Sequence, residues 1–320
     1  TAAAAAAKGK QPTASRAGGH FFGIWARVIG FFFAGGVMLL ACLNIPLFST
    51  FREPFIVEVL ENIWPAALTD PSLAALQNSF LWALVVVTAV IAVIKPTWGA
   101  LVALTGFGIA VAWQGNLWLG ILFLIIAWLW WYTAGRHGGA QANCGLAYPV
   151  FGSVGCAPFA TLATGIGMRV LDAAMTALFG IFTCMLLACL GSCDIMNWQL
   201  GTYWRFSSDQ ILANLDVTVS NVGNWIIAAG WLVAAVVGGL CTMPRRRWIN
   251  IVGTVAASII IVAALFAATW VGSGQVTWSP GVWPLVKTLL CCVVAIGAAC
   301  VFVPEPYTKK RSRRVPSSGA

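Results

Sequence analysis

Eight stretches of the sequence run for 15 to 23 residues with almost no charged side chain. A helix needs about 20 mostly apolar residues to cross a bilayer, whereas transmembrane β-strands alternate apolar and polar residues over about ten positions. The stretches show no such alternation. They predict an all-α, polytopic helical membrane protein with about eight transmembrane helices, at residues 29–48, 80–94, 98–113, 117–132, 170–191, 224–243, 249–271 and 283–303.

The composition agrees with a membrane protein rather than a soluble one. Hydrophobic residues make up 60% of the chain and charged residues 8%, whereas soluble proteins carry roughly 25% charged residues. The net charge of +9 does not indicate a nucleic-acid partner, because the basic residues gather at the ends of the apolar stretches and in the tails. The expected partner is the lipid bilayer.

Three regions of different composition divide the chain. Residues 1–20 are rich in Ala and Gly and predict a disordered cytoplasmic linker, residues 21–303 form the transmembrane domain, and residues 304–320 are a basic cytoplasmic tail. Within the domain, residues 49–79 and 192–223 are expected as outer loops. Because Thr1 stands where Met would, and no signal-peptide pattern precedes the first apolar stretch, we expect a longer protein with a cytoplasmic module upstream.

The distribution of basic residues predicts the orientation in the membrane. Short loops that are rich in Lys and Arg stay in the cytoplasm, whereas acidic residues have little influence on the orientation. With the N-terminus inside, fifteen of the eighteen basic residues are cytoplasmic, and Arg52, Arg205 and Lys287 are not. We therefore predict a multi-pass protein of a bacterial-type cytoplasmic (inner) membrane with both termini in the cytoplasm.

Residues 144–167 are apolar but broken by prolines and glycines. Arg136 and Arg169, on either side of the segment, are both expected in the cytoplasm, so the segment cannot cross the membrane once. It either dips into the membrane and returns or lies at the interface. Irregular backbone is tolerated at membrane depth where protein shields it. The residues that break the segment are Pro149, Gly152, Gly155 and Pro158.

Few residues in the apolar stretches carry chemistry. Their central parts contain no Asp, Glu, Lys, Arg or His, although ion-coupled transporters usually hold such a residue near the middle of the membrane. Asp172 is expected to pair with Arg169 on one helix face, and Lys287 to reach the outer headgroups. Enzyme motifs such as H-E-x-x-H and G-x-S-x-G do not occur. We predict no catalytic, cofactor-binding or metal site in this chain.

Cysteines occur mainly inside the apolar stretches. Seven of the ten lie there and no C-x-x-C pair exists, so these seven are expected to behave as small apolar side chains. Only Cys193, at an outer helix end, is expected to meet an oxidising compartment.

Two groups of polar residues are candidates for binding. A basic triplet and the basic tail could contact anionic lipid headgroups, each cation adding about 1 kcal/mol near the surface. These cations are Arg245, Arg246, Arg247, Lys309, Lys310 and Arg311. The second group lies in the outer loop and comprises Asp194, Arg205 and Asp209. It is the only candidate cluster for a membrane-embedded lipid-modifying enzyme.

The layout resembles the membrane-embedded C-terminal region of actinobacterial serine/threonine protein kinases. The resemblance extends over essentially the whole chain, and the residues that carry it are the Ala-rich stretch 1–19 and the stretch from Tyr148 to Arg169. It implies that this chain anchors, and senses for, a cytoplasmic kinase domain that would lie upstream, because the kinase motifs themselves do not occur here. A small-solute channel or transporter with residues 144–167 as its gate is the alternative, and a lipid-modifying enzyme is the second alternative.

Overall fold

The computed structural model describes residues 14–50, 52–65, 68, 70–191, 207–242, 247–273 and 282–301. Within these ranges the protein is almost entirely helical and contains no strand. Seven helical segments are long and apolar enough to cross a membrane: Ile24–Leu43, Pro96–Gly115, Leu117–His137, Val170–Gly191, Val222–Thr242, Trp248–Val271 and Val282–Val301. The all-α, polytopic helical fold is therefore confirmed.

The chain enters the bundle through α2 (Ala14–Leu43), a helix of 30 residues. It begins before the first predicted span and includes residues 14–20, which the sequence places in the linker. The first predicted span, 29–48, is shorter in the structure, because α2 ends at Leu43 and the short helix η1 (Pro46–Ser49) follows. The expected outer loop, 49–79, contains the short helices α3 (Pro54–Ile63) and η2 (Pro71–Gln77). The outer loop therefore has helical structure of its own.

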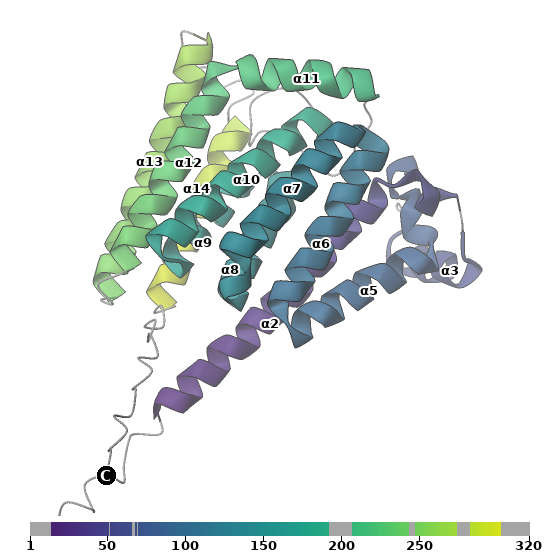
Figure 1. Ribbon diagram of the computed structural model, residues 1–320, viewed down its shortest axis with the longest axis horizontal. Helices are drawn as coiled ribbons and strands as arrows, with labels where there is room; N and C mark the ends of the chain where they lie inside the picture. The colour runs from purple at the N-terminus through teal and green to yellow at the C-terminus, as the bar shows by residue number, and fades with distance from the viewer. Residues whose placement is uncertain are drawn as a thin grey trace, which may run out of the picture.

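The second predicted span is the helix α5 (Ser79–Ile94), which has 16 residues and is shorter than the seven others. At 1.5 Å per residue it is about 24 Å long, less than the ~30 Å thickness of a hydrocarbon core. The reason is Pro96, which favours an extended conformation at Lys95 and begins the next helix. Figure 1 shows α5 inclined to its neighbours and bringing the chain back to the end of the bundle where α6 starts.

The helix α6 (Pro96–Ala110) continues through the π-turn η3 (Val111–Gly115), and α7 (Leu117–Thr133) returns beside it. The side chain of Asn116 accepts hydrogen bonds from the backbone nitrogens of Trp118 and Leu119, at 2.9 and 3.3 Å, and so caps α7. Its amide nitrogen donates to the Ser208 hydroxyl at 2.7 Å. The tight turn expected between these two spans is present at this position.

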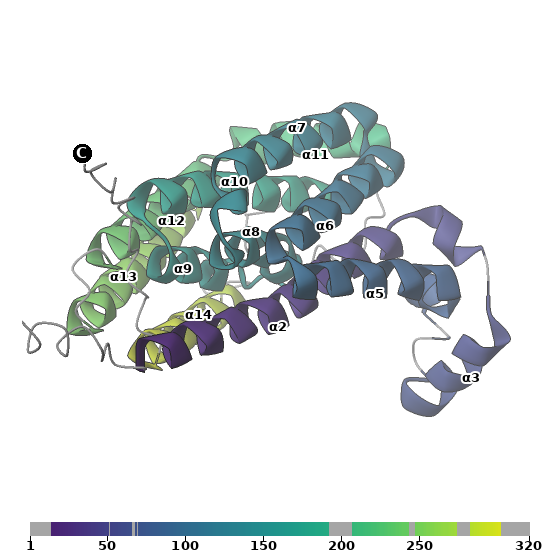
Figure 2. The same cartoon turned by 60° about the horizontal axis from the view of Figure 1, so that its bottom comes forward.

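The remaining long helices are α10 (Val170–Gly191), α12 (Val222–Thr242), α13 (Arg247–Ser273) and α14 (Val282–Val301). The helix α11 (Ser208–Ser220) lies across one end of the bundle (Figure 1). It occupies part of the outer loop expected at 192–223. Figures 1 and 2 both place the start of α2 and the end of α14 at the same end, opposite α11.

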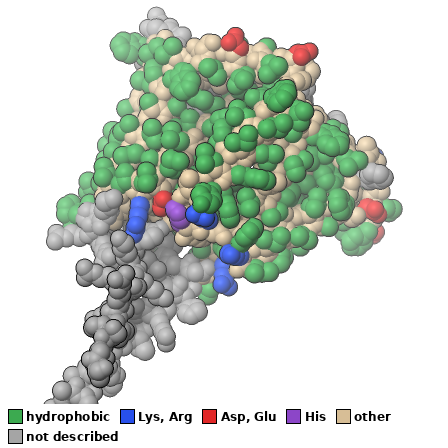
Figure 3. Space-filling model, in the orientation of Figure 1, with side chains coloured by type: hydrophobic (Ala, Val, Ile, Leu, Met, Phe, Trp, Pro, Cys, Tyr) green, Lys and Arg blue, Asp and Glu red, His purple; other side chains and the backbone are tan. Residues whose placement is uncertain are grey.

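The surface of the bundle is divided by charge. Hydrophobic side chains cover the flank in Figure 3, while the Lys and Arg side chains in view gather along its lower edge. The exposed apolar side chains of the protein include Val86, Ile125 and Val293, which are 52%, 60% and 66% exposed. A surface of this composition suits lipid rather than water.

Candidate functional site

The helices α8 (Gly139–Ser153) and α9 (Ala157–Gly167) form a hairpin inside the bundle. They are joined at Val154–Cys156, where Gly155 has a φ of 73°, a conformation that favours glycine. The amide of Cys156 donates to the carbonyl of Phe151 at 2.7 Å and closes the turn. We call these three residues the hairpin turn.

The hairpin contains all four residues that break the predicted segment. Pro149 is buried within α8, and Pro158 is buried in the first turn of α9. A Cβ at Gly152 would lie 3.0 Å from Leu187 and 3.1 Å from the Cys184 sulfur, so this glycine sits directly against α10. The segment is a helical hairpin, and its placement relative to the bilayer stays a prediction.

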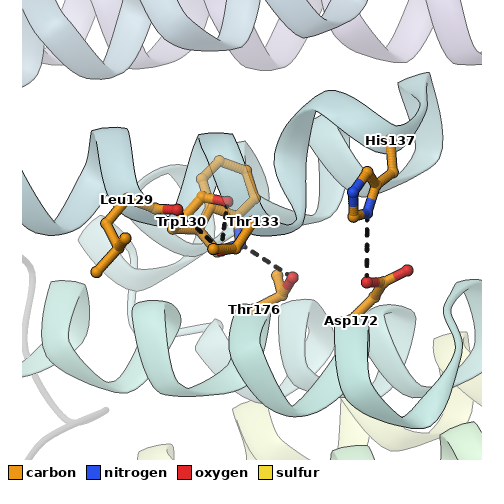
Figure 4. Close-up of polar contacts among 6 residues, drawn as sticks. All are labelled: Leu129, Trp130, Thr133, His137, Asp172 and Thr176. Carbon is orange, nitrogen blue, oxygen red and sulfur yellow. Dashed lines mark hydrogen bonds and ion pairs between the residues drawn. The ribbon is translucent and has the colours of Figure 1, made fainter.

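The Trp130 side chain of α7 holds α8 and α10 together. Its ring is 2% exposed and stacks on Phe179, with centroids 4.7 Å apart. Its indole nitrogen donates to the Thr176 hydroxyl at 3.0 Å (Figure 4). On the other side, a Cβ at Gly145 of α8 would lie only 2.0 Å from the Trp130 ring. Trp130 fills a space that exists because residue 145 has no side chain.

A second ring locks α8 against α10 in the same way. Tyr148 is fully buried, and a Cβ at Gly180 would lie 2.2 Å from its ring. The Tyr148 hydroxyl donates to the Thr161 hydroxyl of α9 at 3.4 Å, which connects the two arms of the hairpin. Large aromatic rings therefore pack against glycines at two points along α8, Trp130 against Gly145 and Tyr148 against Gly180.

The backbone of the other arm, α9, lies directly against the backbone of α12. A Cβ on Gly238 would lie 2.8 Å from the Cα of Gly165, and one on Gly165 would lie 3.1 Å from the Cα of Gly238. Small residues at helix contacts allow such close approach in membranes, where packing replaces the hydrophobic driving force. The Thr242 hydroxyl also donates to the Met168 carbonyl at 3.2 Å.

The open end of the hairpin lies beside η4 (Gly135–His137) and the start of α10. His137 Nδ1 and Asp172 Oδ1 are 3.5 Å apart, as Figure 4 shows, and the side chains are 45% and 15% exposed. The structure thus pairs Asp172 with His137 of η4, and the pairing of Asp172 with Arg169 stays a prediction. The Arg136 guanidinium lies over the Tyr132 ring at 3.8 Å.

The end of the hairpin at its turn is held by α14. The Lys287 ammonium donates to the Val154 carbonyl at 3.2 Å. The sequence predicts that this lysine reaches the outer headgroups, and the structure gives it a partner within the protein. The Cys291 thiol, one helical turn further along α14, donates to the Cys156 carbonyl at 3.7 Å. Sequence reasoning does not single out Cys156, because a residue 135 positions from Cys291 gives no local signal of this contact.

Most of the predicted lipid-contact and outer-loop residues lie outside the described ranges. These are Arg245, Arg246, Lys309, Lys310, Arg311, Asp194 and Arg205. Arg247 begins α13, and only its backbone is described. Asp209 is exposed in the first turn of α11, next to a capping box formed by Ser207 and Gln210. The expected cluster around Asp209 therefore remains a prediction.

Comparisons with protein family models, with characterised proteins and with solved structures found no match.

Proposed function

We propose that this chain is a membrane domain that anchors, and senses for, a cytoplasmic signalling module such as a serine/threonine kinase. The observation that carries the proposal is the common position of the two chain ends. The start of α2 and the end of α14 lie at the end of the bundle opposite α11 (Figure 1). Such an arrangement delivers both terminal segments to one side of a membrane.

The positive-inside rule supports the cytoplasm as that side. Lys95 at the α5–α6 junction, Arg136 in η4 and Arg169 before α10 all belong to connections at the end where α2 begins. Basic residues in such connections are retained in the cytoplasm. We therefore place the domain in a bacterial-type inner membrane with both termini inside, and we assign α5 as an inclined eighth pass, because seven passes would separate the termini.

The packing of the hairpin favours sensing over conduction. Its two arms are held by Trp130, by Tyr148 and by the contact of Gly165 with Gly238. Close-packed interiors switch between discrete arrangements rather than deforming gradually. A hairpin that is held by these contacts can transmit a structural change from one of its ends to the other.

Two experiments test orientation and anchoring separately. Alkaline phosphatase fused after Ala320 should be inactive and green fluorescent protein should be fluorescent, since both report a cytoplasmic C-terminus; the reverse result contradicts the orientation. The coding sequence upstream of Thr1 should contain the H-R-D and D-F-G segments of a kinase. An initiator Met within a few codons of Thr1 would contradict the kinase module and leave the orientation result intact.

A small-solute channel or transporter is the second candidate, and the hairpin itself is the observation that favours it. Transporters often place binding sites at breaks between short helices, such as the hairpin turn that separates α8 from α9. Reconstituted liposomes should then show solute flux that Gly238→Ala abolishes. Liposomes with no flux above protein-free vesicles would contradict this second function.

A further inference from the structure

The hairpin turn gathers two thiols and an ammonium group. Cys156 is the N-cap residue of α9, and Lys287 and Cys291 lie one helical turn apart on α14. The Cys291 thiol donates to the Cys156 carbonyl oxygen at 3.7 Å. Two cysteines far apart in the sequence are therefore neighbours in space.

One carbonyl oxygen brings the ammonium close to the first thiol. The Cys156 sulfur lies 3.9 Å from the Val154 carbonyl oxygen, and the Lys287 nitrogen lies 3.2 Å from the same atom. The distance between the Cys156 sulfur and the Lys287 nitrogen is therefore no larger than the sum of these two distances. The ammonium is within the range at which a charge influences a partly exposed sulfur.

Two sources of positive charge lie beside Cys156: the Lys287 ammonium and the N-terminus of α9. The N-terminus of an α-helix carries a partial positive charge, and Cys156 occupies that position on α9, a helix of 11 residues. Reactive cysteines are found at helix N-termini and beside lysine, in partly exposed positions. Cys156 is partly exposed, whereas Cys291 is only 6% exposed. The two thiols therefore differ in access.

We propose that Cys156 and Cys291 are a thiol–disulfide exchange pair whose substrate is an accessible disulfide, R–S–S–R. The Cys156 thiolate attacks one sulfur, forms a mixed disulfide and releases RS⁻, which takes up the proton that Cys156 gave to solvent. The Cys291 thiol then loses its proton and attacks the Cys156 sulfur. An intramolecular disulfide forms, and the second R–S group leaves as a thiol. Two cysteine thiols are oxidised and one substrate disulfide is reduced.

The new disulfide would link the start of α9 to α14. It would close the hairpin turn against one helix while the other end of the hairpin remains beside η4 and α10. Which compartment supplies the disulfide depends on the proposed orientation, which places the turn toward the outer side. The exchange chemistry itself does not depend on orientation, so a test on the purified chain separates the two ideas.

The test uses the purified, reduced full chain in detergent with oxidised glutathione as the probe disulfide. Peptide mass spectrometry should find a Cys156–Cys291 link in the wild type, and Cys291→Ser should accumulate glutathione on Cys156. Cys156→Ser should leave Cys291 unmodified. The matched control is Cys292→Ser, which removes the neighbouring buried thiol and should leave the Cys156–Cys291 link unchanged.

Lysine variants separate the electrostatic role from a structural one. Lys287→Gln should slow glutathione addition to Cys156 about two- to fivefold, and Lys287→Arg should restore the rate. Size-exclusion profiles confirm that each variant is folded. A wild-type chain whose Cys156 stays unmodified, or whose Cys156 links to Cys193 or to any cysteine other than Cys291, would overturn the proposal.

Discussion

Replacing Gly145 by alanine tests whether the Trp130 ring holds α8 in place. The added Cβ would lie 2.0 Å from Cη2 and 2.2 Å from Cζ2 of Trp130, so the ring or the helix must shift by more than 1 Å. The ring cannot shift freely, because it stacks on Phe179 and donates to Thr176. The substitution therefore disturbs three contacts at once.

The magnitude follows from two opposing terms. Overpacking in a well-packed interior costs about 1–3 kcal/mol, and loss of the hydrogen bond from Trp130 adds about 1 kcal/mol. Alanine in place of glycine inside a helix recovers up to about 1 kcal/mol. The overpacking term is larger, so we expect Gly145→Ala to lower the free energy of unfolding by about 1–3 kcal/mol.

The assay is equilibrium unfolding of the purified protein in mixed detergent and SDS micelles, followed by circular dichroism. Gly297→Ala is the matched control, because a Cβ at this glycine within α14 meets no atom within 4 Å and should leave stability unchanged or slightly higher. Trp130→Leu combined with Gly145→Ala should cost less than the two single changes added together, since the smaller side chain vacates the space. Equal stability of the Gly145→Ala and Gly297→Ala variants would refute the reasoning.

Three further substitutions test other contacts by the same unfolding assay. Asn116→Ala removes the cap of α7 and should cost about 1 kcal/mol; Asn116→Asp keeps the accepting oxygen, so an equal loss in both variants would argue against the cap. Gly238→Ala places a Cβ against the backbone of Gly165 and should cost about 1–3 kcal/mol; an unchanged midpoint would mean that α9 and α12 are farther apart. Asp172→Asn should change stability by less than about 0.5 kcal/mol, because His137 is 45% exposed; a loss above 1 kcal/mol would show a stronger interaction than the geometry suggests.

The long helices could be predicted because their signal is local. An apolar run such as 249–271 identifies a span by length and composition alone, and α13 covers it. The same rule gives a weaker signal at 80–94, because Pro96 limits that apolar helix to 16 residues, fewer than in each of the other seven. The pattern of apolar runs does not reveal α11, which lies within a polar stretch, although Ser207 and Gln210 have the spacing of a capping box.

The hairpin could be predicted only in part. Pro149 and Gly155 indicate a broken segment, and Arg136 and Arg169 indicate that its ends share a side. The partners of the segment could not be predicted, since nothing in the sequence tells which face of α7 meets α8. Trp130 is adjacent to Trp131 in a run of aromatic residues, yet only Trp130 is fully enclosed at the contact with Gly145. Tertiary packing, not local pattern, distinguishes the two.

The glycine contacts also explain how a bundle with so few polar side chains keeps one arrangement. Lipid tails are as apolar as leucine, so burying a leucine between helices gains little over leaving it in the bilayer. Specificity must then come from shape, and here it comes from rings or backbone seated on residues without side chains. Trp130 with Gly145, Tyr148 with Gly180, and Gly165 with Gly238 all involve the hairpin α8–α9. The segment whose sequence is most broken is therefore held in place at three points by contacts of this kind.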